Sequence, residues 1–274
     1  MVALARMPES ADVLWRNLRE LPAFRALLRA VEARFFAGLD LPAPTLDLGC
    51  GDGHFASTGF DYPLSVGVDE SLDSVRAARA RARVYRYVVP AKGERLPFAA
   101  GTFGSAISNS VLEHIPGLAS ALREMSRVLR PDAPFVFTVP SEYFREFLSV
   151  HRGLNGLGLR TVARAYVRWF DHISRHEHYH SPEEWRALLE DVGFEVEQRR
   201  YYFSERALRA LEWGHYLGLP ALLSKALTGR WILAPTVANL WLTDRLLRRY
   251  YEEPLPERGA YLFFVARKIE RMTR

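Results

Sequence analysis

The sequence is poor in cysteine: Cys50 is the only one among 274 residues. A single thiol cannot form an internal disulfide, so the fold is not held by disulfide bonds, and this usage fits a reducing compartment. The first eight residues also lack a charged segment followed by an apolar run. We therefore expect no signal peptide and a cytoplasmic protein.

Long apolar runs are missing as well. The two most apolar stretches, residues 213–224 and 231–243, each hold about a dozen residues and are separated by a segment containing Lys225 and Arg230. A spanning helix needs ~20 apolar residues, so neither stretch crosses a bilayer alone. The segment 213–243 is interpreted as a packed lid or dimer surface, with a peripheral membrane contact or a pocket for a hydrophobic substrate as the alternatives.

No charge of one sign dominates the chain. Lysine and arginine number 37 against 32 acidic residues, a net charge of +5. One dense group of arginines lies between residues 76 and 86, and a solvated helix face explains it better than a polyanion contact. Because no stripe of basic and aromatic residues accompanies it, nucleic acid is disfavoured as a partner.

Between residues 45 and 140, short apolar strands alternate with helical segments. This alternation predicts an α/β fold with a doubly wound, mostly parallel sheet. Strands are predicted at residues 45–48, 64–68, 84–89, 103–108 and 135–139, and helices at 71–82 and 118–129.

The flanking segments are mainly helical. Residues 11–37 show helical spacing of apolar side chains, with Asp12 as a cap and Pro22 as a break. Ser181 begins another helix with a capping box, which ends near Gly193. Further helical segments are predicted at residues 141–172 and 204–257, and the last two strands at 194–203 and 261–267.

The most informative segment is a glycine-rich turn between a strand and a helix, DLGCGDGHF at residues 47–55. Glycines at alternate positions let the backbone approach a ligand closely, and the N-terminus of the next helix favours an anionic group. A dinucleotide site would show G-x-G-x-x-G. Here the third glycine comes one residue early.

With four further blocks in matching order, this pattern resembles the class I S-adenosylmethionine (SAM)-dependent methyltransferases of the small-molecule type. The resemblance implies a Rossmann-like, seven-stranded, mostly parallel sheet with N-terminal helices and a helical insertion before the last strand. It also implies SAM as the methyl donor and a single domain over residues 1–274. The blocks are residues 66–71, 93–98, 103–115 and 122–131, and the parts of the domain are N-terminal helices at 1–44, a SAM-binding core at 45–140, a substrate-side segment at 141–180 and the insertion at 204–257.

The same resemblance assigns cofactor-binding residues. Asp69 ends the second strand and is expected to accept hydrogen bonds from both ribose hydroxyls, as a carboxylate can. One departure is Lys92, which stands where many relatives carry an aspartate that binds the adenine amino group; an ammonium has no acceptor. The residues expected to bind SAM are Asp47, Gly49, Cys50, Gly51, Gly53, Asp69, Glu70, Glu94, Asn109 and Ser110.

Methyl transfer from a sulfonium needs a base only where the acceptor must lose a proton. His114, just past the fourth strand, is the candidate base, although it could equally shape the pocket. Tyr143, His176 and His178 are expected on the substrate side. The four histidines between residues 172 and 180 match no zinc signature, so no metal is expected.

These features predict an enzyme that methylates O, N or C of a small-molecule acceptor, hydrophobic or lipid-like in character. The alternatives are a non-catalytic binding protein that keeps the fold, which Lys92 would favour, and an RNA methyltransferase. Neither the acceptor nor the oligomeric state follows from the sequence.

Overall fold

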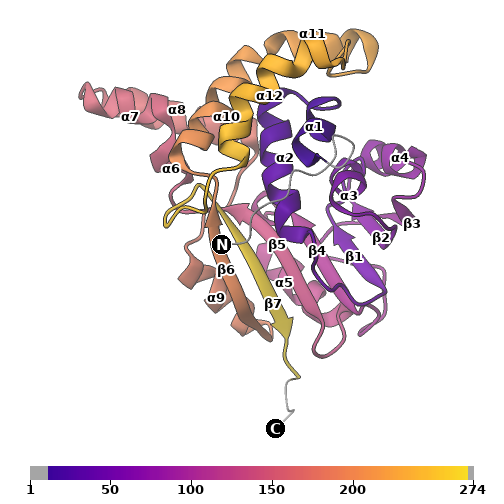
Figure 1. Ribbon diagram of the computed structural model, residues 1–274. Helices are drawn as coiled ribbons and strands as arrows, with labels where there is room; N and C mark the ends of the chain where they lie inside the picture. Colours follow the sequence, from indigo (N-terminus) through magenta and orange to yellow (C-terminus); the bar gives the residue numbers. More distant parts are fainter. Residues whose placement is uncertain (1–11, 271–274) are drawn as a thin grey trace.

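Seven strands form one sheet in the order β3-β2-β1-β4-β5-β7-β6, with helices on both faces (Figure 1). This computed structural model describes residues 12–270, so the segment on which the signal-peptide expectation rests lies outside the described residues. The order confirms the α/β, Rossmann-like prediction, including the N-terminal helices and the helical insertion before the last strand.

All neighbouring strands pair in parallel except at β7, which runs antiparallel to both β5 and β6. The insertion between β6 and β7 begins and ends at the same edge of the sheet, so the chain must return in the opposite direction. The strands are β1 (Thr45–Leu48), β2 (Leu64–Asp69), β3 (Tyr85–Pro90), β4 (Ser105–Asn109), β5 (Pro134–Pro140), β6 (Phe194–Tyr202) and β7 (Tyr261–Lys268).

The central strands are buried on both faces, as parallel strands covered by helices must be. In β5 every residue is buried, and successive side chains alternate between two cores. Val136 packs with the core beneath α2 (Ala23–Phe36) and α3 (His54–Gly59). Phe137 packs with the opposite core, which holds Met125 of α5 (Leu118–Val128) and Trp185 of α9 (Pro182–Asp191).

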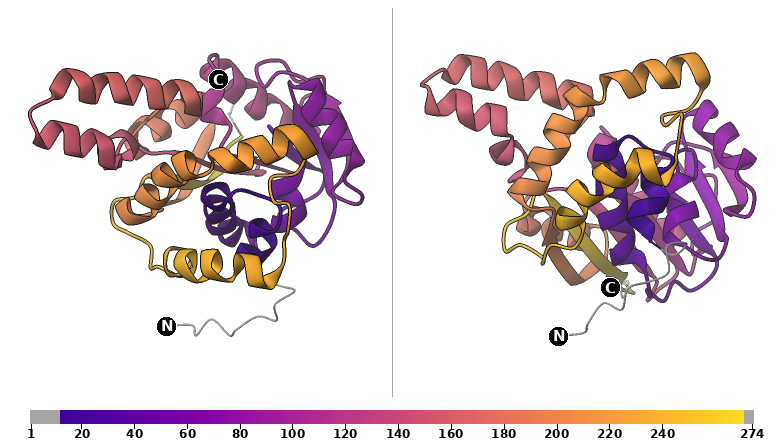
Figure 2. Two further views of the ribbon diagram at one scale, coloured as in Figure 1. Left: turned by 90° about the horizontal axis from the view of Figure 1, so that it is seen from above. Right: turned by 45° about the horizontal axis from the view of Figure 1, so that its top comes forward.

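One further helix, α4 (Leu72–Ala80), packs beside β2 and β3, and the others gather at or near the edge where the parallel strands end (Figure 1). Helices α10, α11 and α12 lie over α1 and α2 at this edge, and α7 with α8 forms an arm that projects from the body (Figures 1 and 2). The helices are α1 (Val13–Leu18), α4 (Leu72–Ala80), α6 (Phe144–Phe147), α7 (Ser149–Gly156), α8 (Arg160–Ser174), α10 (Glu205–Leu217), α11 (Leu219–Thr228) and α12 (Val237–Tyr251).

Local signals in the sequence set several helix ends. The Asp12 side chain caps α1, Pro22 stands between the end of α1 and the start of α2, and Ser181 forms the predicted capping box at the start of α9. The segment predicted as helical from residue 141 is divided into three helices, and at the second of the two breaks a left-handed glycine, Gly158, turns the chain between α7 and α8. No helix among residues 12–270 is both long and apolar enough to cross a membrane.

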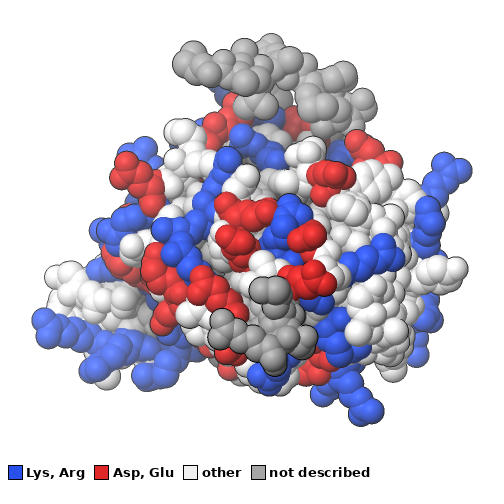
Figure 3. Space-filling model, turned by 90° about the horizontal axis from the view of Figure 1, so that it is seen from below, with Lys and Arg blue, Asp and Glu red and all other residues white. Residues whose placement is uncertain are grey.

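The opposite end of the molecule carries side chains of both charge signs among the described residues (Figure 3). Figure 3 shows acidic side chains gathered among basic ones on this face. A nucleic-acid surface would require a continuous basic patch. The face in Figure 3 therefore gives no support for nucleic-acid binding there.

Candidate functional site

The glycine-rich turn after β1 is built from left-handed residues. Gly49, Gly51 and Gly53 have φ angles of 76°, 54° and 76°. A Cβ on Gly49 would lie 2.4 Å from the Val111 side chain, so only glycine fits there. At Gly51 no atom lies within 4 Å of the Cβ position, and the loop backbone is open to a ligand on this side.

Asp69, the last residue of β2, holds this turn in place. Its Oδ2 accepts a hydrogen bond from the Gly51 amide, and its Oδ1 accepts one from the Ser71 amide, each at 2.9 Å. A carboxylate has about four acceptor positions, so both oxygens can accept another hydrogen bond. The ends of β1 and β2 are thereby joined around one carboxylate.

A cavity of about 1050 Å³ lies along these strand ends. Six of the sequence-predicted site residues line it: Gly49, Asp69, Glu70, Glu94, His114 and, from the substrate side, His176. A smaller cavity of about 340 Å³ shares Gly49 with the large one and is also lined by Asp47, Cys50, Gly51 and Asn109. Gly53, which N-caps α3, lines neither cavity.

Lys92 does not line the large cavity, although its neighbours Ala91, Gly93 and Glu94 do. Lys92 instead pairs with Arg95 in an isolated bridge. Glu94 packs against Gly117, and a Cβ at Gly117 would lie only 2.9 Å from the Cγ of Glu94. The acidic group that this loop presents to the cavity is therefore Glu94.

Asp47, two residues before the first glycine, is 3% exposed. Its Oδ2 accepts a hydrogen bond of 2.6 Å from the Tyr85 hydroxyl of β3. Burial raises the pKa of Asp47 to about 7, because one hydrogen bond does not replace the water that the charged carboxylate has lost. Burial also raises the pKa of the nearby Cys50 thiol, so this cysteine is an unreactive buried group.

Asn109 and Ser110, at the end of β4, are both bonded to a buried carboxylate that the sequence does not single out. Glu32 of α2 accepts hydrogen bonds from Asn109 Nδ2 at 2.8 Å and from Ser110 Oγ at 2.7 Å. It also accepts one from the Tyr202 hydroxyl at 3.1 Å and pairs with Arg29 at 2.5 Å. This fully buried group joins α2 to β4 and β6, and nothing in its helical sequence context indicates that role.

A third cavity, of about 420 Å³, adjoins the large one, and its walls combine apolar and aromatic side chains with charged and polar ones. The two cavities share His114, Arg25 and residues 173–176, so they meet at this boundary. Ser110 lies on the smaller side. The apolar and aromatic side chains that line the 420 Å³ cavity are Phe24, Leu28, Phe144, Phe170, Ile173, Leu211 and Tyr261.

The boundary is formed where the histidine-rich loop after α8 docks on the short 3-10 helix η2 (Leu112–His114). The amide of Glu177 donates to the Glu113 carbonyl at 2.8 Å. His114 donates from Nδ1 to the Arg175 carbonyl at 2.7 Å, and burial lowers the pKa of its imidazole. His176 lies alongside, with 5.2 Å between the ring centroids, and burial lowers its pKa to about 3.

Tyr143 and His178 lie outside the walls of these three cavities. Tyr143 packs beside Tyr201 and under the Arg258 guanidinium, which is 4.1 Å from the ring centroid. His178 bonds through Nε2 to the Ile115 carbonyl at 2.9 Å and therefore holds the loop against η2.

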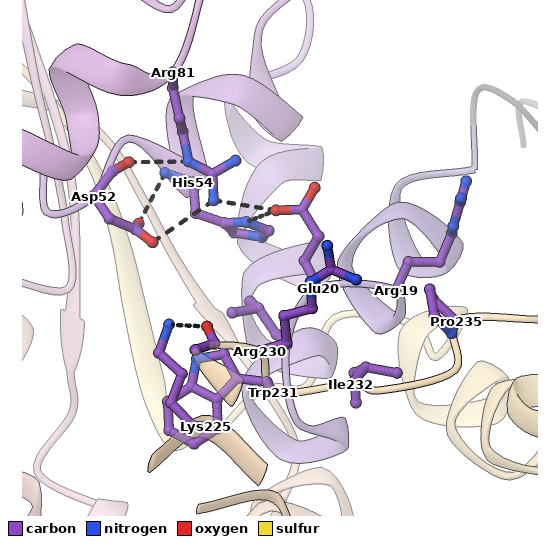
Figure 4. A pocket seen from close by; sticks show the side chains of 12 residues that line it. Arg19, Glu20, Asp52, His54, Arg81, Lys225, Arg230, Trp231, Ile232 and Pro235 are labelled. Carbon is purple, nitrogen blue, oxygen red and sulfur yellow. Dashed lines mark hydrogen bonds and ion pairs between the residues drawn. The ribbon is translucent and has the colours of Figure 1, made fainter. Parts of the chain in front are cut away.

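A separate cavity of about 290 Å³ is lined by Glu20, which lies in the loop between α1 and α2 (Figure 4). Figure 4 shows the Glu20 carboxylate facing His54 and Arg81, at 3.2 and 3.1 Å. The His54 hydrogen bond is the main cause that lowers the pKa of Glu20 to about 2. These contacts tie α1 to the start of α3 and the end of α4, which is a structural role.

Comparison with known proteins gives consistent results. A family model described as a methyltransferase domain matches residues 14–199. An uncharacterized protein of Methanocaldococcus jannaschii is 39% identical over 99 residues, 36% of this chain and 37% of that protein. A malonyl-[acyl-carrier protein] O-methyltransferase of Legionella pneumophila is 33% identical over 102 residues, 35% of this chain and 36% of the enzyme.

The chain thus spans little more than a third of the length of these two relatives. Among solved structures, a complex of the Haloferax volcanii Trm112 methyltransferase activator contains a chain that superimposes with a TM-score of 0.55. The two share 18% sequence identity, with 90% of this chain and 91% of that chain covered. At this identity the similarity concerns the fold.

Proposed function

Because the chain belongs to the class I SAM-dependent methyltransferase family, we propose that it transfers the SAM methyl group to O, N or C of a small hydrophobic or lipid-like acceptor. The observation that carries this proposal is the meeting of two cavities at His114 and residues 173–176. One is lined by Gly49 and Asp69, and the other has aromatic and aliphatic side chains along part of its wall. A methyl group held at their boundary would face both.

The residues of the large cavity fit the chemistry of SAM. Asp69 keeps free acceptor positions for the ribose hydroxyls, although its two oxygens already hold the Gly51 and Ser71 amides. Gly51, which lines the 340 Å³ cavity beside it, leaves open space where a side chain would obstruct the cofactor. Glu94 supplies an acceptor on the adenine side, so Lys92, which does not face the cavity, is weak support for a non-catalytic alternative.

SAM supplies a methyl group that is already electrophilic, so the protein must mainly align the acceptor and exclude water. We assign His114 as the base where the acceptor must lose a proton. Since its Nδ1 donates to the Arg175 carbonyl, its Nε2 carries the lone pair. Its lowered pKa keeps the imidazole neutral near pH 7 and able to accept a proton.

The lipid-like character of the acceptor rests on two features. The 420 Å³ cavity has Phe144, Phe170 and Tyr261 among its walls. Helix α11, near the same edge of the sheet, exposes Leu223 and Leu227 at 66% and 83%. Aromatic side chains in the cavity wall and an exposed apolar helix surface both suit a hydrophobic acceptor.

Calorimetric titration with SAM tests the cofactor site. We expect micromolar binding that Asp69→Ala weakens by roughly 10- to 100-fold, because hydrogen bonds to a charged group contribute about 1.5–3 kcal/mol. Asp73→Ala is the matched control, since Asp73 is 91% exposed on α4 and lines neither the 1050 Å³ nor the 340 Å³ cavity. Equal weakening in both variants would contradict the assignment of Asp69.

Once SAM binding is established, an acceptor screen with hydrophobic small molecules and lipids tests the second half of the proposal. Turnover confined to polar acceptors would contradict the lipid-like assignment. A protein that binds no SAM at millimolar concentration would favour the non-catalytic alternative instead.

A further inference from the structure

Glu113, His114 and His176 form a cluster in the wall between the two cavities. One ligand atom of each side chain lies within 4.8 Å of the other two. Two of the residues come from η2 and the third from the loop after α8. The cluster exists because the amides of Glu177 and His178 bond to the Glu113 carbonyl and bring this loop against η2.

The Glu113 carboxylate is buried without a hydrogen bond, and His114 Nε2 lies 3.8 Å from its Oε1. The residue is 1% exposed, and neither carboxylate oxygen has a hydrogen-bond partner among the residues that the structure describes. The Arg29 guanidinium forms no hydrogen bond with Glu113, because it donates to Glu32. Burying an unpaired carboxylate costs several kcal/mol, so this position favours a bound positive charge.

Both histidines offer a free lone pair to the same space. His114 donates from Nδ1 to the Arg175 carbonyl. The Tyr179 hydroxyl donates to Asp171 Oδ1 at 2.7 Å, so its oxygen accepts from His176 Nδ1 at 2.9 Å. Each Nε2 therefore carries the lone pair. Metal-binding histidines commonly donate their second nitrogen to a carbonyl or carboxylate in this way.

We propose that Glu113, His114 and His176 bind one divalent first-row transition metal ion, of the class Zn²⁺, Co²⁺, Fe²⁺ or Mn²⁺. Two imidazole nitrogens and one carboxylate oxygen suit these ions rather than Mg²⁺ or Ca²⁺. Bonds of about 2.1 Å require ligand atoms within about 4.2 Å of one another, which small side-chain rotations achieve from the present spacing. The remaining coordination positions would face the cavities.

The ion binding itself is independent of the proposed methyl transfer, but its position has a consequence that rests on the proposed function. His114 Nε2 can carry a proton or a metal ion, and not both at once. With the ion bound, an acceptor oxygen could bind at an open coordination position, and the ion rather than His114 would favour its deprotonated form.

Titration of the tag-free full-length protein with CoCl₂ alone tests the proposal, because the visible absorption of Co²⁺ reports its coordination. We expect one saturable site per chain, displaced by ZnCl₂. Glu113→Gln and His176→Ala should each raise the Kd at least tenfold. His180→Ala is the matched control from the same loop, because His180 lies outside the cluster, and its Kd should equal that of the wild type.

No saturable binding by the wild type, or an unchanged Kd in both cluster variants, would overturn the proposal. The two variants are prepared separately, so misfolding of one, seen by circular dichroism, leaves the other as the test. SAM calorimetry on the same preparations reports the cofactor site independently. A failure of metal binding can thus be told apart from a failure of the proposed function.

Discussion

At the scale of single residues, the cofactor turn depends on backbone angles that side chains resist. Gly51 combines a φ of 54° with open space on its cavity side. We predict that Gly51→Val abolishes SAM binding, because the new side chain both strains the turn and occupies ligand space. Calorimetry is the measurement.

Gly101 provides the control for this prediction. Its φ is 63°, it also has no atom within 4 Å of the Cβ position, and it lies in a loop before β4. Gly101→Val should therefore introduce similar strain and leave the affinity for SAM unchanged. If both variants lost binding equally, general destabilisation rather than cofactor obstruction would be the cause.

Also at this scale, the buried Asp47 should make stability depend on pH. Its pKa is raised from 3.8 to about 7, so between these values the folded protein keeps a proton that the unfolded chain releases. The free energy of unfolding should therefore fall as pH rises from about 4 to 7, by on the order of 4 kcal/mol at about 1.4 kcal/mol per pKa unit.

Asp47→Asn removes the ionisation and keeps an acceptor for the Tyr85 hydroxyl. Urea denaturation at a series of pH values should show a smaller decrease in the variant than in the wild type. An identical pH dependence in the two proteins would show that Asp47 is not responsible.

At the scale of elements, one carboxylate joins an N-terminal helix to the sheet. Glu32 of α2 accepts hydrogen bonds from Asn109, Ser110 and Tyr202 and pairs with Arg29. We predict that Glu32→Ala lowers the free energy of unfolding by about 3–5 kcal/mol, because it leaves Arg29 and several donors buried without an acceptor. Chemical denaturation measures the loss.

Glu183→Ala is the comparison for that prediction. Glu183 also forms an ion pair, with Arg199 at 3.3 Å, but its side chain is 67% exposed. Exposed pairs contribute little, so this variant should change stability by less than about 1 kcal/mol. If Glu32→Ala lowered the free energy of unfolding by no more than Glu183→Ala does, the buried network would not hold α2 in place.

At the scale of the whole molecule, exposed apolar side chains gather on the helices of the insertion. Leu222, Leu223 and Leu227 on α11 are each more than half exposed, as are Trp241 and Leu242 on α12. We predict that the protein co-sediments with lipid vesicles through this surface. Leu223→Glu combined with Leu227→Glu should weaken binding at least roughly tenfold, since each buried leucine contributes on the order of 1.5–3 kcal/mol.

Leu72→Glu controls for the added charge, because Leu72 is 57% exposed on α4, outside the insertion. Its vesicle binding should match that of the wild type. Unchanged binding of the α11 double variant would assign the apolar surface of α11 to another role, such as contact with a second chain.

Also at the whole-molecule scale, the sequence by itself determined the features that depend on local rules. Strand and helix order between residues 45 and 140 predicts the sheet, because apolar periodicity is a property of neighbouring residues. The end of β1 follows from the glycine spacing, and the start of α9 follows from the Ser181 capping box. Both signals depend only on local backbone geometry. Family membership rests on the same local blocks.

The tertiary structure alone decided which distant residues meet. The sequence places Glu113 and His176 on separate elements, and only the docking of the loop after α8 on η2 brings them into one cluster. Likewise, nothing in the sequence distinguishes Glu32 from other helical glutamates. Its role follows from the packing of α2 against the end of β4. Such contacts could not be predicted from local patterns, because they depend on how the elements pack and not on the periodicity within any one of them.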